Sequence, residues 1–167
     1  VTNEDPNSDI HQIASNDHTK TLGLTWNYKS DEFLYSTRLK IDHSRKVTKR
    51  NILSVVAQIF DPLGFLSPVT ITAKMFLQQL WLENVSWDES LSEGLHSAWV
   101  SFFYNFNQVL DVKVPRRIIC DKPTRLHLHG FADASERVYG ACLYIRSESD
   151  NKVEVHLLCA KTRVAPL

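Results

Sequence analysis

The chain has 167 residues, a length that suits one ordinary domain or parts of two small ones. Its 19 Lys and Arg residues balance its 19 Asp and Glu residues, and this balance argues against a nucleic-acid module whose whole surface is basic. Hydrophobic residues make up 43% of the chain, too many for a disordered protein, while no apolar run approaches the roughly 20 residues that span a bilayer.

The N-terminal part predicts a β-hairpin after a polar arm. Residues 1–18 show little periodicity and are typical of a loop. Two β-rich runs follow, separated by a polar turn. We therefore expect strands near residues 20–27 and 33–41.

From Thr48 the spacing of apolar residues changes to that of a helix. Thr48 suits the N-cap because its hydroxyl can accept from the first free amides. Asp61-Pro62 is expected to end the helix, since a residue before proline disfavours helical backbone. The apolar face expected for this helix consists of Ile52, Val55, Val56, Ile59 and Phe60.

Two further helices are predicted before residue 112. Ser67-Pro68 has the preferred N-cap and N1 order, and Ser90 with Glu93 has capping-box spacing. Helical spacing makes the apolar residues of both segments core residues rather than stacking platforms. They are Val69, Ala73, Phe76, Leu77, Leu80 and Trp81, then Leu91, Leu95, Ala98, Trp99, Phe102, Phe103, Phe106 and Leu110.

After Val114-Pro115 the apolar period drops to two and predicts strands at 126–133, 138–146 and 153–161. The short connections favour an antiparallel meander. The predicted fold class is α+β: a β-hairpin, three helices, then an antiparallel three-stranded meander. Such a sheet without covering helices leaves an apolar face open, so we expect the C-terminal third to be poorly stable in isolation.

The charges balance in total but not along the chain. Residues 1–37 hold six acids and two basic residues, whereas residues 38–50 hold six basic residues and one acid. Such a run can neutralise nucleic-acid phosphates, although clusters of this kind are most often solvated surface. The candidate nucleic-acid contacts are Arg38, Lys40, Arg45, Lys46, Lys49 and Arg50. A second basic cluster consists of Lys113, Arg116, Arg117, Lys122 and Arg125.

The cysteines and the termini indicate an intracellular segment. Cys120, Cys142 and Cys159 are an odd number without a CxxC pair, so we expect reduced, buried thiols of a cytoplasmic or nuclear protein. The first residues carry acids and no apolar block, and no signal peptide is expected. The opening without methionine suggests part of a longer protein.

The segment FADAS (131–135) places Asp133 at the end of an apolar strand. Asp133 can simply start a turn, and a single carboxylate cannot perform two-metal chemistry, which needs several oxygen ligands. An aspartic peptidase needs Asp, then Ser or Thr, then Gly, whereas here Ala134 and Ser135 follow.

His127 and His129 share the predicted strand face of Asp133. A His-His-Asp metal cluster is therefore conceivable. The alternative is that both histidines form the polar face of a half-buried strand. Both interpretations stay open at this point.

The chain closely resembles the polymerase polyprotein of BEL/Pao-type LTR retrotransposons, in the region known as the Pao retrotransposon peptidase family. The matching blocks are KTLGLTW (20–26), TKRNILSVVAQIFDPLGFLSPVTITAK (48–74), LQQLW (77–81), VSWDE (85–89), LHGFADAS (128–135) and CAKTRVAPL (159–167). The Asp-Ala-Ser triplet fits the peptidase label badly.

This resemblance implies a piece of the reverse transcriptase followed by the start of ribonuclease H. Residues 1–44 would form the palm-end hairpin that grips the primer, 45–112 the helical thumb and tether, and 113–167 the N-terminal part of an RNase H-like domain. The basic run 38–50 would face the template–primer backbone. Asp133 would be the first of four metal-binding acids, and so both a catalytic residue and a ligand of Mg²⁺ in the complete site.

The resemblance also implies that the other catalytic acids lie outside this sequence. The YxDD-type aspartates would precede Val1, and the remaining ribonuclease H acids would follow Leu167. We therefore expect that the chain as given catalyses neither polymerisation nor RNA cleavage. Its implied partners are an RNA–DNA hybrid or template–primer and the rest of the polyprotein, with no membrane. Two alternatives stay open: an aspartic-type peptidase, and a domesticated, non-catalytic nucleic-acid-binding fragment.

Overall fold

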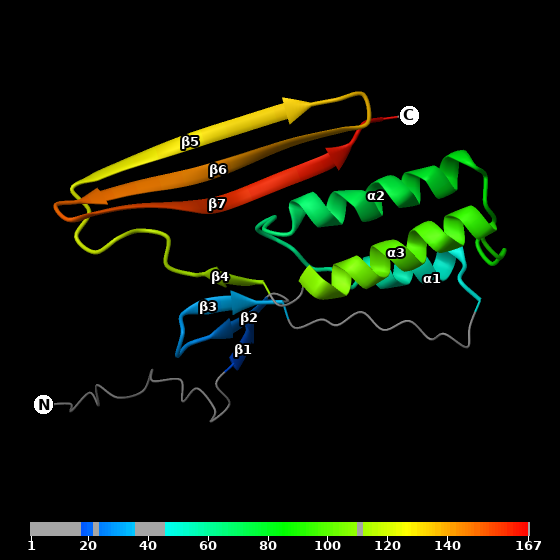
Figure 1. Ribbon diagram of the computed structural model, residues 1–167, viewed down its shortest axis with the longest axis horizontal. Helices are drawn as coiled ribbons and strands as arrows, with labels where there is room; N and C mark the ends of the chain where they lie inside the picture. Colours follow the sequence, from blue (N-terminus) through cyan, green and yellow to red (C-terminus); the bar gives the residue numbers. More distant parts are fainter. Residues whose placement is uncertain (1–17, 22–23, 36–45, 110–111, 167) are drawn as a thin grey trace, which may run out of the picture.

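The computed structural model describes residues 18–21, 24–35, 46–109 and 112–166, and it confirms the α+β class. The N-terminal strands are β1 (His18–Thr21), β2 (Leu24–Asn27) and β3 (Glu32–Leu34). Three helices follow: α1 (Lys49–Val56), α2 (Ser67–Leu82) and α3 (Glu93–Val109). The last strands are β4 (Lys113–Pro115), β5 (Arg125–Ala134), β6 (Val138–Ser149) and β7 (Lys152–Val164). Figure 1 shows α2 between the β5–β7 sheet and the other two helices.

The N-terminal sheet has the strand order β1-β2-β3-β4. The hairpin is confirmed, because β2 pairs antiparallel with β3. The run predicted as one strand at 20–27 is instead two antiparallel strands, with Thr21 paired to Leu24. The sequence reading also missed β4, which has only three residues and ends in a proline that has no amide to donate. Residues 36–41 of the second predicted strand lie outside the described residues.

Helix α1 begins as predicted and ends early. The Thr48 hydroxyl accepts from the Asn51 amide at 3.3 Å, which confirms the N-cap. The helix stops at Val56 rather than at Asp61, because the backbone tightens there. The amides of residues 58 and 59 donate to carbonyls three residues back instead of four.

The starts of α2 and α3 differ from the sequence prediction. Ser67 is the first helical residue rather than the N-cap, and Leu66 takes the N-cap place without a side-chain bond. Helix α3 begins at Glu93, so the predicted start at Ser90 was wrong. Ser90 instead pairs with Thr48 in an isolated β-bridge.

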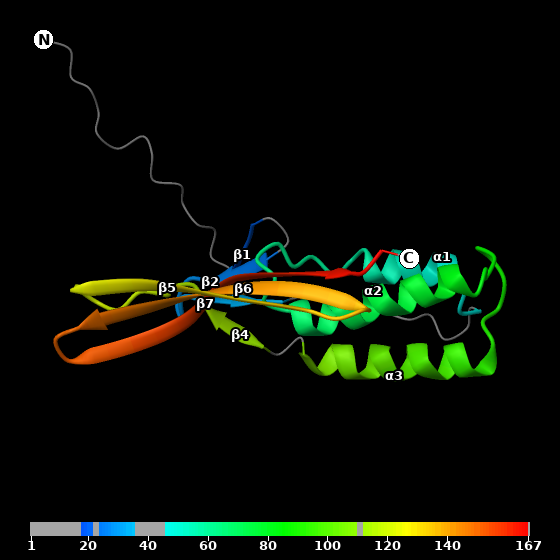
Figure 2. The same cartoon turned by 90° about the horizontal axis from the view of Figure 1, so that it is seen from above.

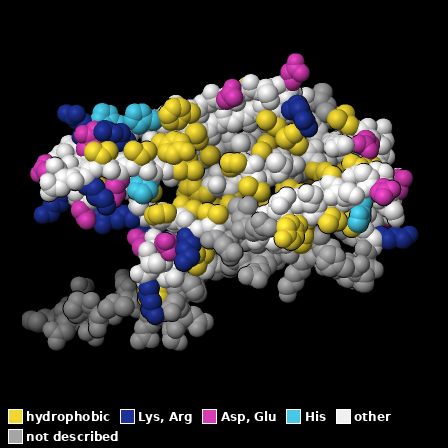
Figure 3. All heavy atoms as spheres, in the orientation of Figure 1, with side chains coloured by type: hydrophobic (Ala, Val, Ile, Leu, Met, Phe, Trp, Pro, Cys, Tyr) yellow, Lys and Arg dark blue, Asp and Glu magenta, His cyan; other side chains and the backbone are white. Residues whose placement is uncertain are grey.

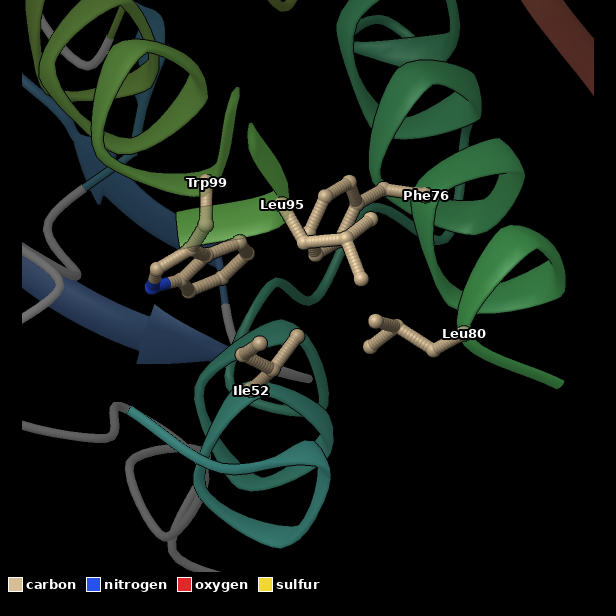
Figure 4. Packing of buried hydrophobic residues seen from close by; sticks show 5 residues of the cluster. All are labelled: Ile52, Phe76, Leu80, Leu95 and Trp99. Atoms are coloured by element: carbon tan, nitrogen blue, oxygen red, sulfur yellow. The ribbon is translucent and has the colours of Figure 1, made fainter. Parts of the chain in front are cut away.

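The helices pack around the Trp99 indole. Trp99 is 1% exposed, and its ring lies 5.7 Å from Phe76 and 5.5 Å from Phe102, measured between centroids. Ile52 and Leu80 complete this core from α1 and α2 (Figure 4). The predicted core positions Phe76, Leu80, Leu95 and Trp99 are therefore confirmed, whereas Trp81 is 51% exposed.

A second core joins the N-terminal sheet to the helices through Tyr35. Its ring packs with Leu24, Leu66 and Phe106, and its hydroxyl donates to Asp61 Oδ1 at 2.8 Å. The other oxygen of Asp61 accepts from the Leu66 amide at 2.8 Å. Burial raises the pKa of the Tyr35 phenol far above its usual value, so the hydroxyl remains a donor.

We expect Tyr35→Phe to lower the free energy of unfolding by about 1–3 kcal/mol, because the hydrogen bond to a part-buried carboxylate is lost. Urea unfolding followed by circular dichroism measures this change. Tyr104→Phe is the matched control, since Tyr104 is 68% exposed. Equal stability of the two variants would show that the Asp61 contact does not hold the sheet to the helices.

The C-terminal sheet has the order β5-β6-β7 and is antiparallel throughout. The predicted meander is confirmed, and each strand is longer than expected. Figure 2 shows this sheet nearly edge-on, with much of its length projecting beyond the helices. Large apolar side chains on it are exposed, including Leu128 at 61% and Phe131 at 60%.

A loop and a helix fasten β7 to the rest of the fold. The Ala160 amide donates to the Leu63 carbonyl at 2.8 Å. From α2, the side-chain Nε2 of Gln78 donates to the Ala165 carbonyl at 2.7 Å. The helices and the C-terminal sheet are therefore joined directly, as well as by the chain between them.

Candidate functional site

Asp133 lies near the end of β5 with its side chain exposed. Its Oδ1 accepts from the Ala134 amide at 2.9 Å. Across the sheet it pairs with Gly140, and Gly140 pairs with Thr162 of β7. The side chain of Thr162 fills the space above Gly140, since a Cβ at Gly140 would lie 3.0 Å from Thr162 Cγ2.

A cavity of about 400 Å³ lies between the start of α2 and this part of the sheet. Its lining is mostly apolar and includes Pro68 and Ile71 from α2, Phe131 and Asp133 from β5, and Cys142 from β6. Asp133 therefore lies near the end of β5, beside the cavity at the start of α2.

The residues that the structure describes do not complete a metal site around Asp133. Among them no group of three or more His, Cys, Asp or Glu side chains is placed to hold an ion. A two-metal centre needs several oxygen ligands. Asp133 supplies one carboxylate, so these residues alone do not fit a resident pair of Mg²⁺ ions.

The His-His-Asp cluster does not form. His127 and His129 do share a face, with ring centroids 6.1 Å apart. Asp133 lies four and six residues further along the same strand, about 13 and 20 Å away at the rise of a β-strand. The alternation of side chains along the strand places all three on one face, but Asp133 is too far from the histidines for the three to bind one ion.

Residues 48–167 match the Pao retrotransposon-like RNaseH-like domain. The chain belongs to this family. No curated protein matches the chain. The match confirms the resemblance to a retrotransposon polyprotein region, and its description is RNaseH-like rather than peptidase. It covers the three helices as well as the C-terminal sheet, in agreement with the contacts that join them.

An RNaseH-like domain implies a nucleic-acid substrate, and Mg²⁺ is the ion typical of the family. Among the described residues, no helix has the length and apolar character that crossing a bilayer requires.

The basic run is described only from Lys46 onward; Arg38, Lys40 and Arg45 lie outside the described residues. Lys46 is exposed. Lys49 is 4% exposed, and its Nζ donates to the Val85 carbonyl at 3.2 Å.

The Lys49 ammonium also lies 3.4 Å from the centroid of the Trp81 ring. Trp81 itself is 51% exposed and meets Trp87 edge to face at 5.4 Å. The lysine therefore joins α1 to the end of α2 through a cation–π contact. Trp81, predicted as core, therefore lies at the surface, with the Lys49 ammonium over one face of its ring.

Arg50 is exposed and ion-paired. Its guanidinium binds both carboxylate oxygens of Asp88, at 2.8 and 3.0 Å. This pairing lowers the pKa of Asp88 and raises the pKa of Arg50. One edge of the guanidinium is thus occupied by a carboxylate.

The second basic cluster is partly neutralised within the structure. Arg116 pairs with Asp31, and Arg117 pairs with Asp121. The Arg116 guanidinium holds the pKa of the Asp31 carboxyl below its usual value. Lys122 and Arg125 are exposed.

The cysteines are free thiols. Cys120 is buried, and its amide donates to the hydroxyl of Ser147 at 3.0 Å. Cys142 and Cys159 are half-buried in the sheet. Arg146, which no sequence motif marks, lies opposite His127 in the strand ladder. Only the register between β5 and β6 identifies it.

Proposed function

We propose that this chain handles an RNA–DNA hybrid within the reverse transcriptase and ribonuclease H region of a retrotransposon polyprotein. The observation that carries the proposal is the exposed Asp133 carboxylate, opposite Gly140 near the end of β5, in a member of an RNaseH-like family. In this proposal residues 1–44 belong to the primer-grip hairpin, 45–112 to the thumb and tether, and 113–167 to the RNase H-like sheet.

The direct attachment of the sheet to the helices supports a shared substrate path. Lys74 and Gln78 of α2 both donate to carbonyls in or just after β7. The helices and the C-terminal sheet, joined in this way, can bind one duplex at two places. Proteins promote phosphoryl transfer mainly by positioning the reacting groups and by electrostatic stabilisation. The inter-element contacts thus favour one nucleic-acid-binding unit over two tethered ones.

Asp133 is proposed as one ligand of the family's Mg²⁺. The described residues do not supply the further carboxylates of such a site, so we derive no catalytic step for this chain. We accordingly propose that the 167-residue chain binds hybrid and does not cut it.

The basic run is proposed to contact the phosphate backbone of the hybrid. Lys46 and Arg50 are exposed next to the start of α1, and Arg38, Lys40 and Arg45 precede them in the sequence. Lys49 has a different part in this proposal: its buried ammonium secures Trp81 and Val85, so it supports the surface on which its neighbours lie.

The peptidase alternative finds no specific support in the geometry. Aspartic peptidases work with two carboxylates that share a proton. Asp133 is followed by Ala134 and Ser135 rather than by a hydroxyl residue and a glycine, so the chain around it lacks the residues of the peptidase loop. A domesticated, non-catalytic binding fragment would share the hybrid-binding surface proposed here.

The proposal is tested by fluorescence anisotropy with a hybrid of about 18 base pairs, in EDTA, at several salt concentrations. We expect Arg45→Gln, Lys46→Gln and Arg50→Gln together to reduce the slope of log K against log salt by about two to three, since each lost phosphate contact removes about 0.9. Lys49 is left unchanged because it is buried.

Lys161→Gln is the matched charge control, because Lys161 is exposed on the C-terminal sheet. An unchanged slope in the triple variant would reject the basic run as the binding surface. Cleavage of the hybrid after addition of Mg²⁺, lost in Asp133→Asn, would reject the proposal that this chain binds without cutting.

A further inference from the structure

Two histidines lie side by side on the part of β5 farthest from the helices. The rings of His127 and His129 have centroids 6.1 Å apart and an interplanar angle of 29°. The His127 side chain is 45% exposed, and every residue of β5 is exposed. Neither histidine is therefore explained as the polar face of a buried strand.

The neighbouring strand adds positive charge to the same face. Residues paired across a ladder share a face, and the ladder pairs His127 with Arg146, His129 with Tyr144, and Arg125 with Glu148. Figure 3 shows histidine, basic and acidic side chains gathered at this end of the sheet.

The remaining strand presents no charge on this face. In β7 the residues paired with Glu148, Arg146 and Tyr144 are Val153, Val155 and Leu157. The loop before β5 meets this end of the sheet through Thr124, whose amide donates to the Glu148 carbonyl at 2.7 Å. Glu148 is the acid that faces the histidines, with its Oε1 3.6 Å from His127 Nε2 and also paired with Arg146.

We propose that Arg125, His127, His129 and Arg146 form a phosphate-binding surface, the histidine face, for the backbone of the hybrid, and that its affinity rises as the two imidazoles protonate. This inference rests on the proposed function, because it assumes a nucleic-acid partner. It adds a contact region remote from Asp133 and a dependence on pH.

The charge count favours a polyanion as occupant. With both imidazoles neutral, two guanidinium groups face the Glu148 carboxylate, and the histidine face carries a small positive excess. Imidazoles gain their charge between about pH 8 and pH 5, and protonation of both adds two positive charges to the exposed strand. A strand of nucleic acid offers a phosphate at every 3.4 Å or so of its axis, which is dense enough to meet several of these groups at once.

The histidine face and Asp133 lie on the same face of β5, the histidines beyond the helices and Asp133 at the hollow beside α2. The two regions lie on one face of one strand, about 13–20 Å apart, and a hybrid covers that distance in roughly six base pairs. Because the sheet projects beyond the helices at this end, no described helix blocks the approach. The histidine face would therefore extend the footprint of the hybrid away from the proposed metal ligand.

The test compares hybrid binding at about pH 6 and pH 8, in EDTA, with the full 167-residue chain. We expect the slope of log K against log salt to be about two units steeper at pH 6, as two imidazoles each neutralise a phosphate. His127→Gln with His129→Gln should abolish this difference and leave binding at pH 8 unchanged. His156→Gln is the control, because His156 pairs with Ile145 on the opposite face.

A second variant keeps the test informative if the glutamine variant folds poorly. His127→Lys with His129→Lys should bind at pH 8 with the slope that the natural chain shows at pH 6, and should lose the pH dependence. Binding at pH 8 without a gain at pH 6 would overturn the histidine face alone. Absence of binding at both values would overturn the proposed function, so the two failures are distinguishable.

Discussion

Trp99→Ala is expected to lower the free energy of unfolding by about 3–5 kcal/mol, the cost of replacing a fully buried large aromatic side chain by a methyl group. The indole is 1% exposed and its ring contacts Phe76, Phe102 and Phe103. Its removal leaves a cavity where α1, α2 and α3 converge. The free energy of unfolding of a domain is typically only about 5–15 kcal/mol. The variant should therefore be largely unfolded well below the melting temperature of the natural chain.

Urea unfolding followed by far-ultraviolet circular dichroism measures this loss without relying on the fluorescence of the tryptophan removed. Tyr104→Ala, on the same helix but 68% exposed, should change stability by less than about 0.5 kcal/mol. A loss below about 1 kcal/mol for Trp99→Ala would mean that the three helices are not organised around this indole.

The helical core could be predicted because its signal is local. Leu95, Trp99 and Phe106 recur at helical spacing, and all three are buried. Trp81 has the same spacing in α2 and yet is half exposed, with the Lys49 ammonium rather than an apolar core against its ring. A periodic pattern identifies a face of a helix, but the partner of each position depends on how the helices pack.

The predicted ends of helices and strands were wrong where tertiary contacts outweigh the local sequence preferences. Ser90 has the sequence of a helix cap, but its backbone pairs with Thr48 from another segment. The three residues of β4 form a strand only because β3 is available beside them. Both features depend on residues far away in the sequence, and single-sequence patterns do not contain that information.

The candidate site was predictable in part. The position of Asp133 near the end of an exposed strand follows from the FADAS pattern, and the structure adds its pairing with Gly140 and the cavity beside α2. Burial of Lys49 could not be predicted from the basic run, because the sequence of such a run does not show which side chains face water and which pack against a tryptophan. The histidine face also required the strand register, which sets Arg146 opposite His127.

Gly64 forms the joint between the helices and the C-terminal sheet. Its backbone has φ +76°, a left-handed conformation that favours glycine. A Cβ at this position would overlap the carbonyl oxygen of Ala160 and lie 2.8 Å from the Ser67 hydroxyl. The obstacle is the backbone of β7, which cannot move aside as a flexible side chain could.

Gly64→Ala is therefore expected to cost about 2–5 kcal/mol, from the left-handed backbone together with overpacking against β7. The substitution should mainly weaken the contact between the Gly64 loop and β7, where the Ala160 amide donates to the Leu63 carbonyl. Hydrogen exchange at Ala160 should become faster than exchange in α2, and the sheet should lose protection at lower urea than the helices lose their circular dichroism signal.

Gly94→Ala is the matched control: nothing lies within 4 Å of its Cβ position, and alanine in α3 should stabilise the chain by about 0.5–1 kcal/mol. If Gly64→Ala unfolds in one transition with the natural midpoint, the loop does not couple the two parts, and the argument for a single hybrid-binding unit loses its structural basis.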